Sequence, residues 1–144
     1  MLKPRCTGHC LIYNDEIYVF GGYTAQYKRS RVFERYNYIL NTWTPFDLKM
    51  DIGIECCLLM SGPCVGEFSC IGGNFLSGRT TSVRTYNIVN KTISTELGNL
   101  VKQRILLKGF SANKSIFIFG GDNPATCEEC NLEDRFFKIC QYPG

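Results

Sequence analysis

The segment Cys127-Glu128-Glu129-Cys130 has the spacing in this sequence that is most readily connected with chemistry. Two cysteines separated by two residues occur in zinc sites and in thioredoxin-like redox sites. A zinc site needs four ligands, and a thioredoxin-like site needs a strand–helix junction. Cys6 and Cys10 flank His9 in a similar cluster, but they belong to a different part of the chain. We therefore expect neither a metal nor a cofactor.

His9 is the only histidine of the chain, and histidine is the commonest general acid–base residue. A serine or cysteine triad would have to use this one imidazole. The sequence contains no nucleophile elbow of the form G-x-S-x-G, so hydrolysis is unsupported. A structural role at the start of a strand is the simpler interpretation.

Nine cysteines in 144 residues raise the question of compartment. An odd number cannot all pair within one chain, and the N-terminus lacks the apolar region of a secretory signal. No run approaches the ~18 to 20 consecutive apolar residues of a spanning helix. We expect a cytoplasmic chain in which most cysteines act as small buried apolar residues.

The charge pattern does not indicate a nucleic-acid or membrane partner. The net charge of +3 comes from 16 basic and 13 acidic residues spread along the chain, without a block of one sign. Stacking aromatics and a continuous basic groove, as in single-strand binders, are not evident either. We expect no nucleic acid and no membrane partner.

The elements that must position these residues repeat along the chain. A run of β-forming residues that ends in a glycine pair occurs at 16–22, 68–73 and 115–121, with intervals of 51 and 48 residues between the first glycines. Such a period is typical of an array of one supersecondary unit. High aromatic and glycine content favours strands and turns over helices. The sequence therefore predicts an all-β protein of three units, at about 5–50, 51–101 and 102–144.

Each unit reads as two hairpins, and hence as about four antiparallel strands. In the first unit, 7–13 and 17–20 form a hairpin across the turn pair Asn14-Asp15, and 31–38 and 42–44 form another across Leu40-Asn41. The second hairpin returns 50 residues later at 85–87 and 91–93. In the third unit Arg104 precedes Gly120 by 16 residues, as Arg5 precedes Gly21.

A glycine pair after an apolar strand, then Tyr, then an aromatic seven residues later, resembles the kelch motif of β-propellers. The residues that carry it are Gly21, Gly22, Tyr36 and Trp43; Gly72, Gly73, Tyr86 and Ile93; and Gly120, Gly121, Cys130 and Phe137. Ile93 and Cys130 depart from the pattern. The resemblance implies a kelch-type propeller fragment of three four-stranded antiparallel blades, with Tyr36 and Trp43 in a core.

Propellers close with four to eight blades, so three blades would leave two open edges. We expect either a part of a longer propeller or two copies that meet to give six blades. Self-association through the open blade edges is the corresponding expectation for a free chain.

The resemblance also implies a function. Kelch propellers often serve as adaptors or scaffolds, so we expect a non-catalytic protein-interaction module. Some are enzymes, and a lyase or epimerase completed by further blades is the alternative. A kelch-type copper oxidase would need several imidazoles, and this chain has one.

The loops after the glycine pairs are the expected contact surface for a protein partner. Segment 23–31 combines Tyr, Arg and small polar residues, as binding surfaces do, and segment 74–79 lies on the same side. Arg29, Arg31 and Arg79 of these segments could bind the carboxylates of an acidic partner segment. Segment 122–129 is acidic, so the rim should be electrostatically uneven. The predicted contact residues are Tyr23, Tyr27, Lys28, Arg29, Arg31, Phe75 and Arg79.

Overall fold

The computed structural model describes residues 1–25, 28–50, 53–62, 64–75, 78–94, 97–122 and 126–140. Over these ranges the regular secondary structure consists of strands alone, which confirms the all-β prediction. The described residues contain no helix long and apolar enough to pass through a membrane.

Three antiparallel sheets of four strands each follow one another along the chain. The first consists of β2 (His9–Tyr13), β3 (Glu16–Phe20), β5 (Val32–Asn37) and β6 (Thr42–Lys49). The second consists of β7 (Leu58–Ser61), β8 (Glu67–Ile71), β11 (Val83–Asn87) and β12 (Thr92–Ser94). The third consists of β13 (Leu107–Ala112), β14 (Ser115–Gly120), β15 (Cys127–Asn131) and β16 (Phe136–Cys140). The prediction of four antiparallel strands per sheet is confirmed, although β6 is longer than expected.

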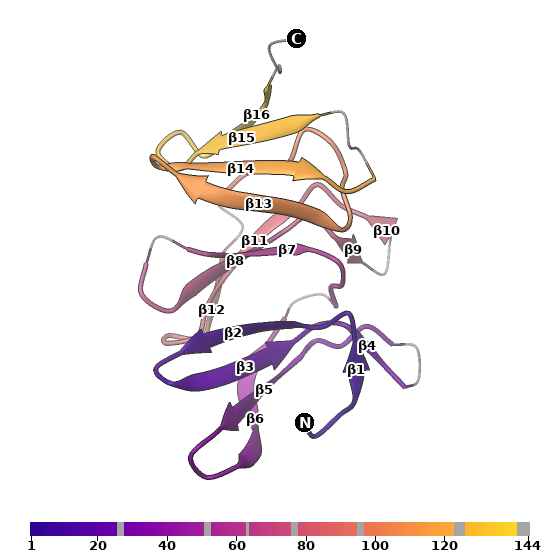
Figure 1. Ribbon diagram of the computed structural model, residues 1–144, viewed down its shortest axis with the longest axis vertical. Coiled ribbons are helices and arrows are strands. Elements are labelled where there is room, and N and C mark those ends of the chain that lie inside the picture. Colours follow the sequence, from indigo (N-terminus) through magenta and orange to yellow (C-terminus); the bar gives the residue numbers. More distant parts are fainter. Residues whose placement is uncertain are drawn as a thin grey trace.

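Two short strand pairs lie beside these sheets. β1 (Arg5–Cys6) pairs with β4 (Tyr23–Thr24), and β9 (Asn74–Phe75) pairs with β10 (Gly78–Arg79). Both pairs lie on the right-hand edge of Figure 1, at the ends of the sheets opposite the hairpin turns on the left. We call this edge the rim.

The tight turns have the backbone that their sequences predict. Asn14 and Asp15, between β2 and β3, have φ of 47° and 57°, and Asn113 and Lys114, between β13 and β14, have φ of 49° and 63°. Two successive residues with positive φ make a type I′ turn, whose twist matches that of the flanking strands. Asparagine tolerates this conformation better than most residues.

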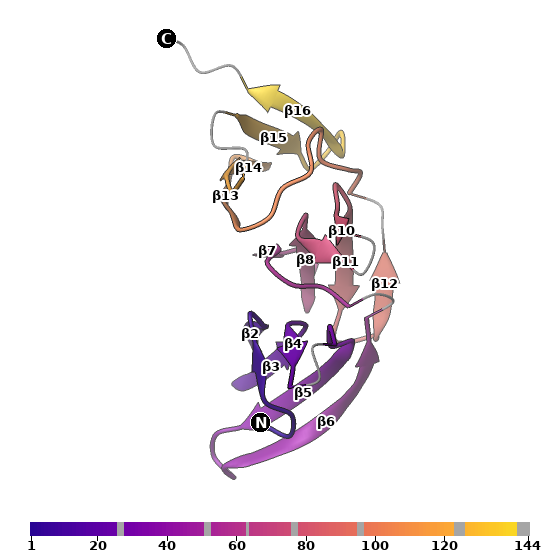
Figure 2. The same cartoon turned by 90° about the vertical axis from the view of Figure 1, so that its right-hand side faces the viewer.

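The three sheets are arranged as a fan. In Figure 2 they follow one another from bottom to top along an arc. The first strands, β2, β7 and β13, lie on one side of the arc, and β6 and β12 lie on the other. Each sheet therefore has a face toward its neighbour, and the first and third sheets each have one face without a neighbour.

The cross-strand register is the same in the three sheets. Tyr36 lies directly opposite Trp43, Tyr86 opposite Ile93, and Cys130 opposite Phe137. The positions that depart from the aromatic pattern thus occupy the same places in their sheets as the positions that follow it.

The apolar core is divided between the two gaps of the fan. Residues between the first and second sheets include Tyr18, Phe20, Phe33, Phe68 and Tyr86, and those between the second and third include Ile71, Val83, Ile116, Ile118 and Phe137. Since side chains alternate along a strand, each sheet contributes to two faces. Burial of this apolar surface holds neighbouring sheets together.

Tyr36 and Trp43 are not in a core, which corrects the expectation. Their rings stack with centroids 4.8 Å apart, and both are only half-buried. Phe33 and Tyr36 are three residues apart on β5, so they point to opposite faces, and Phe33 occupies the face toward the second sheet. Tyr36 and Trp43 lie on the uncovered face.

The glycine pairs lie where one sheet meets the segment that leads into the next. Gly22 N donates to Ile54 O at 2.9 Å, and Gly73 N donates to Arg104 O at 2.8 Å. A Cβ on Gly72, whose φ is +60°, would lie 2.9 Å from Arg104 O. Only glycine accepts both the left-handed backbone and this approach.

Candidate partner-binding rim

An open cleft of about 620 Å³ lies on the rim of the first sheet. It is lined by Pro4, Arg5, Cys6, Tyr23, Thr24 and Ala25. The glycine pair that ends β3 turns the chain back so that β4 pairs with β1, with Tyr23 opposite Cys6. The two short strands therefore form the walls of this cleft, which we call the rim cleft.

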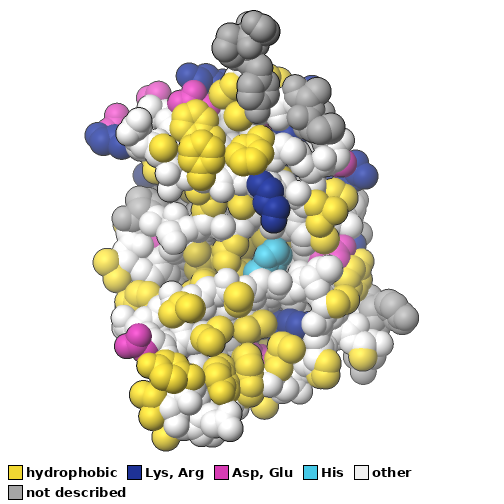
Figure 3. Space-filling model, viewed as in Figure 1, with side chains coloured by type: hydrophobic (Ala, Val, Ile, Leu, Met, Phe, Trp, Pro, Cys, Tyr) yellow, Lys and Arg dark blue, Asp and Glu magenta, His cyan; other side chains and the backbone are white. Residues whose placement is uncertain are grey.

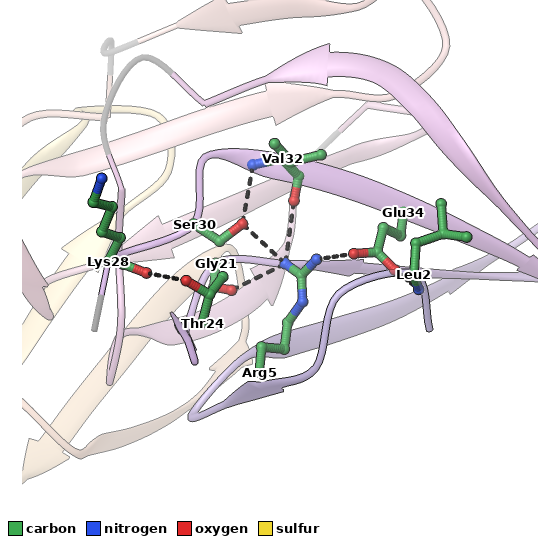
Figure 4. Close-up of polar contacts among 8 residues, drawn as sticks. All are labelled: Leu2, Arg5, Gly21, Thr24, Lys28, Ser30, Val32 and Glu34. Carbon is green, nitrogen blue, oxygen red and sulfur yellow. Dashed lines mark hydrogen bonds and ion pairs between the residues drawn. The ribbon is translucent and has the colours of Figure 1, made fainter. Parts of the chain in front are cut away.

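Both terminal nitrogens of the Arg5 guanidinium bind acceptors within the protein itself (Figure 4). Nη1 donates to Gly21 O at 3.1 Å and to Val32 O at 3.2 Å, and Nη2 donates to the carboxylate of Glu34. The side chains of Arg5 and Glu34 are each 2 % exposed. Arg5 therefore fixes the base of the rim cleft and does not offer a free charge to a partner.

The ring of Tyr23 is held in place by Arg29. The Arg29 guanidinium carbon lies 5.1 Å from the ring centroid, a cation–π distance. Arg29 Nε and Nη2 both donate to Glu55 Oε1, at 3.2 and 3.0 Å, and Asn74 Nδ2 donates to the same oxygen at 3.0 Å. Tyr23 is thus pre-ordered by a network that reaches the second sheet.

Two hydrogen bonds join Thr24 to Lys28. Thr24 N donates to Lys28 O at 3.1 Å, and Thr24 Oγ1 donates to the same oxygen at 3.3 Å (Figure 4). Lys28 is exposed. Tyr27, which was predicted to contact a partner, lies outside the described residues.

Each of the three predicted arginines has an acceptor within the protein. Arg29 binds Glu55 as described above, Arg31 Nε donates to Met50 O at 2.9 Å, and Arg79 binds the carboxylate of Asp122. Arg31 and Arg79 remain exposed, whereas the Arg29 side chain is only 13 % exposed. An acidic partner would have to share these guanidinium groups with the acceptors that they already have.

The ring of Phe75 is not exposed on the rim, although β9 lies there, which corrects the sequence-based placement. It is 8 % exposed and packs in the core between the first and second sheets. Because β9 alternates, its neighbour Asn74 faces the ion-pair network and Phe75 turns inward. The guanidinium of Arg84 lies 5.9 Å from its ring centroid.

The acidic segment 122–129 contributes little free negative charge at its described positions, against expectation. Glu128 is fully buried and binds Arg104 Nε at 3.0 Å. Glu129 accepts a hydrogen bond from Ser115 Oγ at 2.9 Å, and this bond together with Lys138 lowers the pKa of its carboxyl. Asp122 forms an ion pair with Arg79 and accepts a hydrogen bond from the backbone N–H of Ile105.

The cysteines do not form a metal site among the described residues, where no group of three or more His, Cys, Asp and Glu side chains is placed to hold an ion. Cys127 and Cys130 are three residues apart on β15, so their sulfurs point to opposite faces. Cys130 lies in the core between the second and third sheets. All nine cysteines are free thiols.

Sequence reasoning missed the carboxylates that bind the repeated arginines. Glu34 and Glu128 are buried partners of Arg5 and Arg104. The available signal was the equal spacing of the two arginines from their glycine pairs. Arg104 Nη1 donates to Gly120 O at 3.0 Å, as Arg5 Nη1 does to Gly21 O, so this spacing reports a repeated contact.

Comparison with known families gives one match, to the kelch motif, over residues 4–46. A search of curated proteins found no significant match. The matched residues span β1 to β6, including the glycine pair, Tyr36, Trp43 and the walls of the rim cleft. The expected resemblance is therefore confirmed, and this motif supports the assignment of the chain to the kelch-repeat family.

Proposed function

We propose that this chain is a three-blade arc of a kelch-type β-propeller and works as a non-catalytic interaction module that binds a protein partner at its rim. Three observations support the arc. The sheets have four antiparallel strands in sequential order, their cross-strand register is shared, and apolar layers fill both gaps between them. This is the arrangement by which repeated units bury surfaces that one unit alone would expose.

The rim cleft is the observation that carries the binding function. Its lining combines apolar groups of Pro4, Ala25 and the Tyr23 ring with a small number of polar atoms, as ligand clefts do. A pre-ordered tyrosine contributes contact area at low entropic cost. We propose that an apolar or aromatic side chain of the partner enters this cleft.

The charge around the rim cleft favours a partner segment with acidic residues. Lys3 lines an adjoining depression of about 260 Å³. Lys28 and Arg31, which follow Tyr23 in the sequence, are both exposed. Carboxylates beside the apolar anchor would meet these cations. Adaptor or scaffold proteins use such contacts to hold a peptide segment of another protein. The nine free thiols agree with a reducing, cytoplasmic setting.

The test uses acidic peptides selected against the purified chain from a displayed library. Tyr23→Ala should weaken binding of a selected peptide by at least about ten-fold, as expected for the central anchor of a contact surface. Tyr38→Ala is the matched control, because Tyr38 is 55 % exposed and lies at a hairpin turn away from the rim. Equal effects of the two substitutions, with both variants folded, would overturn the assignment of the rim cleft.

The two uncovered faces suggest how the arc is completed. The face of the third sheet that points away from the second carries Phe110, Phe117 and Phe119, and Phe110 and Phe117 stack with centroids 5.3 Å apart. On the first sheet the corresponding face toward its neighbour carries Tyr18 and Phe20. We propose that each uncovered face takes a further sheet of the same type, from more blades or from a second copy. A strictly monomeric mass in light scattering over a wide concentration range would exclude the second copy.

A further inference from the structure

A thiol from the segment before β7 and an imidazole from β2 meet on the inner side of the arc. Cys57 Sγ lies 3.3 Å from His9 Nε2, although the residues are 48 positions apart. A cavity of about 390 Å³ opens beside them, with His9, Cys56, Cys57, Leu106, Leu107 and Lys108 among its lining. In Figure 3 the imidazole, the one cyan side chain, lies in a hollow with a cationic side chain next to it.

Equivalent turns in the three repeated units bring the residues of this site together. Thr7, Cys56 and Leu106 have φ of 52°, 53° and 55°, and they stand shortly before β2, β7 and β13 respectively. The same left-handed turn therefore leads into the first strand of each sheet. Because these strands lie side by side along the inner side of the arc (Figure 2), the residues after the turns converge on one cavity. His9 comes from the first unit, Cys57 from the second and Lys108 from the third.

The surroundings favour the ionised thiol. Burial alone would raise the pKa of Cys57, but hydrogen bonds with Cys70 and His9 and the charge of His9 lower it to about 6. Burial alone would lower the pKa of His9, but the hydrogen bond and charge of Cys57 raise it. The cationic Lys108 lines the cavity too, and the pKa of the adjacent Cys56 thiol is raised by burial and by Glu55. The two pKa shifts thus act in the same direction, toward a thiolate at Cys57 and an imidazolium at His9.

Cys70 is positioned as a second thiol. It lies on β8 opposite Leu59, two residues beyond Cys57, so the two cysteines lie on the same face. Both belong to the core between the first and second sheets, and their side chains are hydrogen-bonded. Cys70 is fully buried, whereas Cys57 lines the cavity. A small reagent in the cavity would reach Cys57 first.

We propose that Cys57 is a modification site for small hydroperoxides, with His9 as its proton donor and Cys70 as the resolving thiol. The Cys57 thiolate attacks the terminal oxygen of the hydroperoxide, so that an S–O bond forms and the O–O bond breaks. The leaving alkoxide, or hydroxide for hydrogen peroxide, takes the proton of the His9 imidazolium. Cys57 is oxidised to sulfenic acid, and the hydroperoxide is reduced to an alcohol or water.

The second step closes a disulfide. The Cys70 sulfur attacks the sulfenic sulfur of Cys57, an S–S bond forms, and the S–O bond breaks. The departing hydroxide takes the Cys70 proton and leaves as water. Two thiols are oxidised by two electrons in total, and one hydroperoxide is consumed.

The other cysteines provide internal controls. Cys6, Cys10 and Cys64 are exposed, and Glu67 raises the pKa of Cys64. At pH 7 a thiol with the pKa of Cys57 is mostly ionised, whereas an ordinary exposed thiol of pKa about 8.5 is ionised to only a few per cent. Lower basicity reduces the intrinsic nucleophilicity of a thiolate, so the preference for Cys57 expected from ionisation alone is roughly two- to three-fold.

The experiment treats the intact chain with substoichiometric hydrogen peroxide and dimedone, and maps adducts by peptide mass spectrometry. Cys57 should be labelled before the exposed cysteines. Without dimedone the product should be a Cys57–Cys70 disulfide, and Cys70→Ser should accumulate the sulfenic acid. Labelling that begins at Cys6, Cys10 or Cys64 would overturn the proposal, as would a different disulfide.

His9→Gln tests the role of the imidazole and should slow Cys57 oxidation at pH 7 by about ten-fold. Should the variant fail to fold, the pH dependence of iodoacetamide alkylation in the unsubstituted protein decides the question. The rate at Cys57 should have its midpoint near pH 6, and the midpoint at Cys64 should lie above that of an ordinary thiol, because Glu67 raises its pKa. A Cys57 midpoint at about 8.5, the value of a free thiol, would contradict the thiolate–imidazolium pair.

Discussion

Arg104 Nε lies 3.0 Å from Glu128 Oε1 in the third sheet, and both side chains are completely buried. Arg5 and Glu34 make the corresponding pair in the first sheet. Each carboxylate also accepts a backbone N–H from the segment that precedes its arginine, Val101 N at 2.6 Å and Leu2 N at 2.6 Å. Each arginine–glutamate pair thus connects the segment that leads into its sheet with the third strand of that sheet, which carries the glutamate. The arginine also binds the glycine pair that ends the second strand.

Glu128→Gln should be strongly destabilising. The substitution retains one acceptor but removes the negative charge, so the Arg104 guanidinium is left buried without its counter-ion. Breaking a buried pair in this way costs about 3–5 kcal/mol in the free energy of unfolding. Urea unfolding followed by circular dichroism measures the change.

The matched control for this substitution is Glu133→Gln. Glu133 pairs with Lys114 at 2.6 Å, but the side chains are 64 % and 74 % exposed. An exposed pair contributes at most about 1 kcal/mol, so the stability should hardly change. Similar losses in the two variants would show that burial does not set the strength of the Arg104–Glu128 contact.

Gly72→Ala and Gly120→Ala should lower the free energy of unfolding by different amounts. Both glycines have positive φ, 60° and 71°, so both variants lose about 1 kcal/mol or more from the backbone conformation. At Gly72 the new Cβ also collides with Arg104 O, whereas at Gly120 it meets no atom of the described residues within 4 Å. We expect Gly72→Ala to be the more destabilising by at least about 1 kcal/mol, as backbone strain of this kind costs.

Unfolding of the two glycine variants under the same conditions measures this difference. Equal losses would mean that the segment containing Arg104 moves away without cost, and that the glycine pair does not fix the distance between neighbouring sheets. A larger loss at Gly120 would mean that its apparent open space is filled by another part of the protein in solution.

The sequence predicted local pairings well because a two-residue turn and an alternating strand determine their own register. The opposition of Tyr36 to Trp43 and of Cys130 to Phe137 follows from spacing alone. The direction of Phe75 could not be predicted in this way, because a two-residue strand has too few positions to reveal an alternation.

The sequence repeat could not predict contacts between segments that are distant along the chain. Glu34 follows Arg5 by 29 residues, whereas Glu128 follows Arg104 by 24, so the repeat does not preserve the spacing of the ion pair. The contact between His9 and Cys57 depends on how two sheets are placed against each other, and no local periodicity carries that information.

Tyr86→Ala should be more destabilising than Tyr36→Ala. Tyr86 is 0 % exposed between two sheets and stacks on Phe68 with centroids 5.4 Å apart, so its loss should cost about 3–5 kcal/mol. Tyr36 holds the same position on a sheet with an uncovered face and keeps its O–H bonded to Asn41 at 2.8 Å. Its loss should cost about 1–2 kcal/mol. Thermal unfolding of both variants compares the covered and the uncovered face, and equal costs would contradict this difference.

Alkaline conditions should weaken the protein partly through Cys130. Burial, with Asp134 and Glu129 nearby, raises the pKa of its thiol from 9.0 to about 11. Between these values the unfolded chain loses the proton while the folded chain keeps it, so stability falls as the pH rises from 9 to 11. Cys130→Ala should flatten this part of the stability profile, measured by urea unfolding at several pH values. An unchanged slope would show that other groups determine the alkaline loss.

Trp43 should report whether the outer face of the first sheet becomes covered. It is the only tryptophan, it is half-buried, and it stacks on Tyr36 on the face without a neighbour. At low concentration its fluorescence should be accessible to acrylamide, because no sheet lies over it. If a second copy packs on this face, raising the concentration should shift the emission to the blue and reduce quenching, since the indole loses contact with water.

Phe117→Glu should suppress both changes by placing a charge on the complementary face of the third sheet. Phe136→Glu, at a site already 68 % exposed, should leave them intact. Concentration-dependent shifts that persist in Phe117→Glu would show that the faces of the first and third sheets do not pack on each other.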